Sequence, residues 1–94
     1  MIPGQLNLSG QGLTAVPDTV FQSRELHHLN LGENQLETLP ERLGELTSLT
    51  HFFAHENRLR ALPESIGQLM QLEVLDLSHK NRLATLPESL AQLH

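Results

Sequence analysis

The 94-residue chain contains no cysteine, tryptophan or tyrosine, and its three aromatic residues are all phenylalanine. Without cysteine it cannot form a disulfide framework, a thiolate zinc site or a thiol nucleophile, and a reducing compartment is favoured. Few aromatic rings leave few platforms on which single-stranded nucleic acid could stack. Eleven Asp and Glu residues outnumber six Lys and Arg residues, giving a formal net charge of −5. This balance argues further against nucleic acid as a partner.

Long hydrophobic runs are also missing from the sequence. No segment approaches the roughly 18 consecutive apolar residues of a transmembrane helix. The first residues lack the positive charge and the apolar run of a signal peptide. We therefore expect a cytoplasmic protein that does not contact a membrane, unless it is delivered elsewhere as an effector. A chain of this length is expected to form a single domain over residues 1–94.

Leucine is abundant, with 21 residues, and recurs in a frame with a period of 23. Pro17, Pro40 and Pro63 are 23 residues apart, and Pro87 follows 24 residues after Pro63. Around each proline the same apolar positions return. The four predicted repeats are approximately residues 3–25, 26–48, 49–71 and 72–94. A fixed period of this length predicts a solenoid in which neighbouring repeats stack to make a shared core.

The local patterns predict two alternating elements. Apolar and polar residues alternate in Leu29–Leu31 and in Leu75–Leu77, which is typical of a short strand with one buried face. After the prolines, apolar residues lie three apart, which suits one turn of 3₁₀ or α-helix. Proline is favoured at a first helical position, and the acidic residue after it would lie at the positive end of the turn's dipole.

From Leu26 to Leu46 the sequence follows the pattern LxxLxLxxNxLxxLPxxLxxL. This pattern resembles the leucine-rich repeat family, and specifically its 23-residue LPxxI subtype, which occurs in bacterial effectors, repeat–kinase fusions and Ras-associated scaffolds. The resemblance implies an α/β leucine-rich repeat solenoid, with a parallel β-sheet on the concave face and short helical or 3₁₀ turns on the convex face. It also implies a protein-binding module that is not itself an enzyme.

One polar position of the frame is interpreted as structural. It is held by Gln11, Asn34, Asn57 and Asn81. In leucine-rich repeats the asparagine at this position points inward, and its amide satisfies backbone groups of adjacent turns as a ladder. The fourth copy has one extra residue before Asn81, which predicts a bulge at His79 and Lys80. The alternative is that His79 and Lys80 protrude beside the binding face.

Six histidines raise the question of a metal or catalytic site. In the repeat register His28 and His51 lie side by side at roughly 4.8 Å, but no third ligand is evident beside them. His51 and His55 are about 13 Å apart along one strand, too far to bind one ion. Glu33 and Glu56 share an outward column, which we interpret as a solvated acidic patch. We therefore expect no catalytic residue, cofactor or metal ion.

A protein partner is predicted to bind outward strand positions on the concave face. These positions are His28, Asn30, His51, Phe53, His55, Val74 and Asp76. Phe53 is unusual because alternation after the inward Phe52 places its large apolar ring outside. The alternatives are a locally distorted strand, or a ring that leans over the small Ala54 and is partly covered. Otherwise Phe53, surrounded by polar residues, has the composition of a binding hot spot.

Two other functions stay open from the sequence alone. The chain could be the recognition segment of a larger enzyme, such as a kinase or ligase fused in cis, or it could be a self-associating structural unit. Leu90 and Leu93 belong to a repeat without a successor, and no polar capping segment follows them in this sequence. We therefore expect either a longer repeat array or a homodimer formed through the uncapped C-terminal end.

Overall fold

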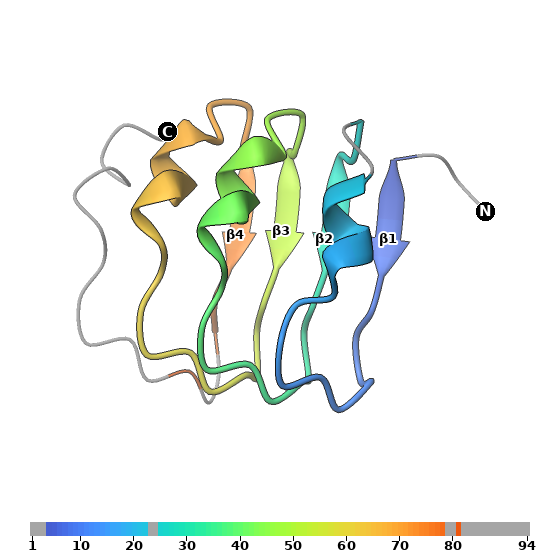
Figure 1. Cartoon of the computed structure of the whole chain (residues 1–94), viewed down its shortest axis with the longest axis vertical. Helices are drawn as coiled ribbons and strands as arrows, with labels where there is room; N and C mark the ends of the chain where they lie inside the picture. The colour runs from blue at the N-terminus through green and yellow to red at the C-terminus, as the bar shows by residue number, and fades with distance from the viewer. Residues whose placement is uncertain (1–3, 23–24, 79–80, 82–94) are drawn as a thin grey trace.

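The computed structural model describes residues 4–22, 25–78 and 81 (Figure 1). Within these residues, four three-residue strands alternate with three 3₁₀ helices. The strands are β1 (Gln5–Asn7), β2 (His28–Asn30), β3 (His51–Phe53) and β4 (Val74–Asp76). The helices are η1 (Asp18–Gln22), η2 (Glu41–Glu45) and η3 (Glu64–Gln68).

The four strands form one parallel sheet in the order of the chain. The register pairs Gln5 with His28, His28 with His51, and His51 with Val74, so each step corresponds to one sequence repeat. Figure 1 shows the strands side by side, with the helices following one another in the same order. The predicted fold class, a repeat solenoid with a parallel sheet and short 3₁₀ turns, is therefore confirmed.

The hydrophobic core lies between the sheet and the 3₁₀ helices. Leu29 and Phe52, the central residues of β2 and β3, are fully buried, and so are Leu43 of η2 and Ile66 of η3. The corresponding leucines of β1 and β4 are only partly buried. Each of these outer strands pairs on one side only within the described residues, so the second and third repeats carry the best-packed core.

In the described turns, proline precedes the 3₁₀ helix, whereas the sequence pattern places it at the first helical position. Pro40 and Pro63 precede η2 and η3 in extended conformation, with φ values of −74° and −68°. Their carbonyl oxygens accept the N–H groups of Leu43 and Ile66 at 3.0 and 3.1 Å. The acidic residue then becomes the first residue of the helix, and Glu41 Oε2 also accepts the N–H of Ser65 at 3.3 Å. Glu41 therefore lies at the positive end of its helix and also forms a hydrogen bond to the next repeat.

Gly44 marks the close approach between η2 and η3. A Cβ added there would lie 2.7 Å from the Ser65 Cβ and 2.9 Å from the Ser65 carbonyl oxygen. We expect Gly44→Ala to lower the free energy of unfolding by about 1–3 kcal/mol, because backbone must move to relieve the contact. Urea denaturation followed by circular dichroism measures this loss. The control is the exposed neighbour Glu45, whose change to alanine should cost about 0.5 kcal/mol or less; equal midpoints for Gly44→Ala and wild type would contradict the prediction.

Several expectations from the sequence concern residues that the structure does not describe. The bulge at His79 and Lys80, and the apolar C-terminal end at Leu90 and Leu93, lie outside the described residues. In the described part of the chain, no helix has both the length and the apolar character needed to cross a membrane.

Candidate functional site

The outer sheet face, defined as the surface formed by the first and third residues of each strand, carries two columns of side chains. The first column is Gln5, His28, His51 and Val74, and the second is Asn7, Asn30, Phe53 and Asp76. His55 follows β3 by two residues and contacts the same region through Asp76. The structure therefore brings together all seven residues that the sequence assigned to partner binding.

Three rings form a row across β2 and β3. The ring centroids of His28 and His51 are 4.2 Å apart, and those of His51 and Phe53 are 6.3 Å apart. Gln5 Nε2 lies 3.5 Å from His28 Nδ1, and Thr50 Oγ1 lies 2.9 Å from His51 Nδ1. The two imidazoles thus pack against each other, and the Nδ1 atom of each is within hydrogen-bonding distance of a neighbouring side chain. No group of three potential metal ligands occurs among the residues that the structure describes.

Phe53 borders a hollow in the outer sheet face. Its ring is half-buried, and the hollow has a volume of about 340 Å³. The lining residues are Gln5, Leu6, Asn7, His28, Asn30 and Phe53. The hollow therefore combines one phenyl ring and one leucine with three side-chain amides and an imidazole. Its volume is large enough for one or two side chains of a partner and lies at the lower end of the range of ligand pockets.

The second column has a structural role that the sequence analysis missed. Oδ1 of Asn7, Asn30 and Asp76 accepts the backbone N–H two residues later, at 3.0, 2.9 and 3.0 Å. This is an Asx turn, a local side-chain acceptor that helps the chain to leave the strand. Asn or Asp at the same register position, with Ser or Gly two residues later, is the sequence signal for it. Phe53 occupies this position in the third repeat and cannot accept a hydrogen bond there.

His55 is positioned by the neighbouring repeat. A Cβ added at Gly32 would overlap the His55 ring, so the ring packs on the Gly32 backbone. His55 Nδ1 is buried and lies 3.9 Å from Asp76 Oδ2, a pairing that the sequence analysis did not anticipate. This distance is too long for a hydrogen bond. Ser78 Oγ donates to Asp76 Oδ1 at 2.6 Å and not to the imidazole, so the three residues do not form a catalytic relay.

The asparagines at the structural position connect adjacent repeats. Asn57 is 1% exposed; its Oδ1 accepts the N–H of Leu36, and its Nδ2 donates to the carbonyl oxygens of residues 31, 54 and 55. Asn34 makes the corresponding bonds one repeat earlier. Asn81 accepts from Leu59 and donates to residues 54 and 77, so these bonds continue past the extra residue of the fourth repeat.

The structure differs from the sequence analysis at Gln11. Its side chain is exposed, and the bond that links it to Asn34 is made by its backbone N–H, which donates to Asn34 Oδ1 at 3.0 Å. Within the described residues, no repeat precedes the first one. An inward amide at Gln11 would therefore have no earlier backbone groups to bind. Gln11 is therefore held by Asn34 from the next repeat rather than contributing a buried amide of its own.

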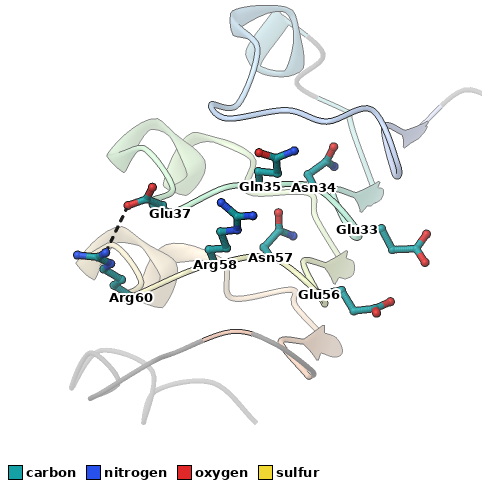
Figure 2. A pocket seen from close by; sticks show the side chains of 8 residues that line it. All are labelled: Glu33, Asn34, Gln35, Glu37, Glu56, Asn57, Arg58 and Arg60. Atoms are coloured by element: carbon teal, nitrogen blue, oxygen red, sulfur yellow. Dashed lines mark ion pairs between the residues drawn. The ribbon is translucent and has the colours of Figure 1, made fainter.

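A larger hollow of about 730 Å³ lies between the segments that follow β2 and β3 (Figure 2). It is lined by Glu33, Asn34, Gln35, Glu37, Glu56, Asn57, Arg58 and Arg60. Figure 2 shows Glu33 and Glu56 at one end and the ion pair between Glu37 and Arg60, 3.8 Å long, at the other. Both asparagines are already used between the repeats, and no apolar side chain lines the hollow. The smaller hollow beside Phe53 is therefore the better candidate for recognition.

The backbone explains why Glu33 and Glu56 stand at the edge of this hollow. Both adopt the left-handed region, with φ values of 56° and 53°, and Gly10 adopts it at the equivalent place in the first repeat, with φ of 67°. Side chains in this conformation are strained by about 1–2 kcal/mol per residue. The strain follows from the tight turn that comes after β1, β2 and β3, so the two carboxylates share a column for structural reasons.

Comparison with known proteins agrees with this architecture. A leucine-rich repeat profile matches residues 5–59, and a second leucine-rich repeat profile matches residues 71–93. The chain belongs to the leucine-rich repeat family. No curated protein matches the sequence.

The chain is also similar to a solved structure, a leucine-rich repeat protein of Leptospira interrogans, with a TM-score of 0.62 and 26% sequence identity. The similarity covers 94% of this chain and 34% of that one, so this chain spans about a third of its length. Leucine-rich repeats are non-catalytic modules that generally mediate interactions between proteins.

Proposed function

We propose that this chain recognises another protein through the outer sheet face, which is the concave face of a leucine-rich repeat solenoid, with Phe53 at the centre of the contact. His28, Asn30, His51, His55, Val74 and Asp76 surround this ring and form the more polar part of the surface. A large aromatic side chain encircled by polar groups is the typical composition of an interface hot spot.

The observation that carries the proposal is the replacement of a turn-forming residue by Phe53. In the other three repeats this register position supplies the acceptor of an Asx turn. In the third repeat the acceptor is lost, yet the phenyl ring stays half-buried on the outside and does not join the core. The substitution therefore costs a hydrogen bond without adding a fully buried side chain, and a contact made outside the chain accounts for it.

We expect Phe53→Ala to weaken partner binding by about 2 kcal/mol or more, which is roughly 30-fold in the dissociation constant. Affinity capture with the whole chain, followed by mass spectrometry, identifies the partner, and calorimetry then compares the variants. The matched control is Met70→Ala, because Met70 is a large apolar side chain that is 58% exposed and lies outside the outer sheet face. Unchanged affinity in Phe53→Ala, or an equal loss in Met70→Ala, would refute the proposal.

The finer family assignment is also proposed. The 23-residue period, and a Leu–Pro pair followed three residues later by Leu43 or Ile66, support membership of the LPxxI subtype. We further propose a cytoplasmic location, which the absence of cysteine supports. We also propose a partner that is neither nucleic acid nor membrane, and the net charge of −5 argues against nucleic acid. The similar Leptospira protein is about three times as long, which supports the alternative that these repeats are the recognition segment of a longer protein.

A further inference from the structure

We infer that the hollow beside Phe53 receives an arginine side chain of the protein partner, with the guanidinium group over the Phe53 ring. The inference rests on the proposed function, because it assigns a chemistry to the partner of that same face. Three observations support it: the groups that line the hollow, the distribution of charge around it, and an arginine–phenylalanine contact elsewhere in the chain.

The lining groups match a guanidinium better than an apolar side chain. A guanidinium has five N–H donors around its edge, is weakly hydrated and stacks on aromatic faces. The Phe53 ring offers such a face, while Gln5, Asn7 and Asn30 offer amide oxygens around it. Oδ1 of Asn7 and of Asn30 each accept one backbone N–H, which leaves a second lone pair on each oxygen. A purely apolar side chain would cover these amides without giving them hydrogen bonds.

Charge on this side of the molecule favours a cation. The described arginines lie elsewhere: Arg42 is on η2, and Arg58 and Arg60 line the larger hollow. Asp76 lies on the outer sheet face, and the exposed Glu33 and Glu73 lie close to the ends of β2 and β4. With a formal net charge of −5 on the chain, a positively charged partner is attracted and a negatively charged one is repelled.

The chain already contains the proposed contact in another place. The guanidinium carbon of Arg42 lies 4.8 Å from the centroid of the Phe21 ring on the helix side of the solenoid. Within the described residues, no arginine lies over the Phe53 ring. An arginine from the partner would complete at Phe53 the arrangement that Arg42 makes at Phe21.

The test is a titration of the ¹⁵N-labelled chain, followed by two-dimensional NMR, with four small probes. They are the N-acetyl amides of arginine, lysine, citrulline and leucine; citrulline has the shape of arginine without its charge. We expect saturable shifts of the amides near residues 5–8, 28–32 and 51–55 with the arginine probe. Its dissociation constant should be about two- to five-fold lower than that of the lysine probe, since lysine is a hydrated point charge that does not stack.

A matched variant separates stacking from simple contact. Phe53→Leu keeps an apolar side chain but removes the ring, so it should abolish the preference for arginine over lysine, whereas Met70→Ala should keep it. Equal binding of arginine and lysine, binding of citrulline as strong as that of arginine, a preference for leucine, or no saturable shift would each overturn the inference. These outcomes leave the proposed function standing, because that depends on the effect of Phe53→Ala on the captured partner.

Discussion

Asn57→Ala is expected to lower the free energy of unfolding by about 3–5 kcal/mol, a large part of the roughly 5–15 kcal/mol that stabilises a typical domain. The amide of Asn57 makes four hydrogen bonds, and all four partners are backbone groups. Alanine would leave the buried Leu36 N–H without its acceptor, which costs about 1–3 kcal/mol. The carbonyl oxygens of residues 31, 54 and 55 would each lose one of two hydrogen bonds, at about 1 kcal/mol for each bond, because they also accept from Asn34, Asn81 and the Glu33 N–H.

Urea denaturation followed by far-ultraviolet circular dichroism measures the loss, because the chain has no tryptophan or tyrosine for a fluorescence assay. If Asn57→Ala does not fold at all, Asn81→Ala gives a graded result: Asn81 is only partly buried and makes three such bonds, so its loss should be smaller. Gln35→Ala is the control, since Gln35 is exposed and lies beside Asn34. A loss in Asn57→Ala or Asn81→Ala no greater than in Gln35→Ala would show that the amides do not hold the repeats together.

The sheet could be predicted from the sequence because a strand has no freedom to slip in this fold. A shift of one residue would move Leu29 or Phe52 from the core to the outside, so the 23-residue period fixes the pairing. The asparagine position could be predicted for a similar reason, since buried backbone groups require partners. Gln11 is the exception, because a terminal repeat has a neighbour on one side only and the requirement is weaker there.

The orientation of side chains on the outer sheet face could not be predicted in this way. The repeat register places His55 on the outer side, but its ring position depends on Gly32, which is one repeat earlier and leaves room by having no Cβ. Its approach to Asp76 depends in turn on that ring position. Alternation assigned Asn30 and Asp76 to the surface around Phe53 without showing that each also closes an Asx turn. These features arise from contacts between repeats, which a pattern within one repeat does not contain.

The adjacent residues Phe52 and Phe53 are expected to differ strongly in what they contribute to stability. Phe52 is fully buried in the centre of β3, so Phe52→Ala should lower the free energy of unfolding by about 3–5 kcal/mol. Phe53→Ala should lower it by about 1 kcal/mol or less, because the ring is half-buried outside the core and makes no hydrogen bond.

Phe53→Asn gives this comparison a sharper form. It restores the acceptor that Asn7, Asn30 and Asp76 supply in the other repeats, so the variant should be as stable as the wild type or more stable by about 0.5–1 kcal/mol. The same variant should lose partner binding, because the ring is gone. Stability and binding would then change in opposite directions at one residue, as expected where a side chain is retained for recognition. If Phe53→Ala and Phe53→Asn instead destabilise the fold as much as Phe52→Ala does, the Phe53 ring belongs to the core. The assignment of the outer sheet face as the binding surface would then fail, because it depends on this residue.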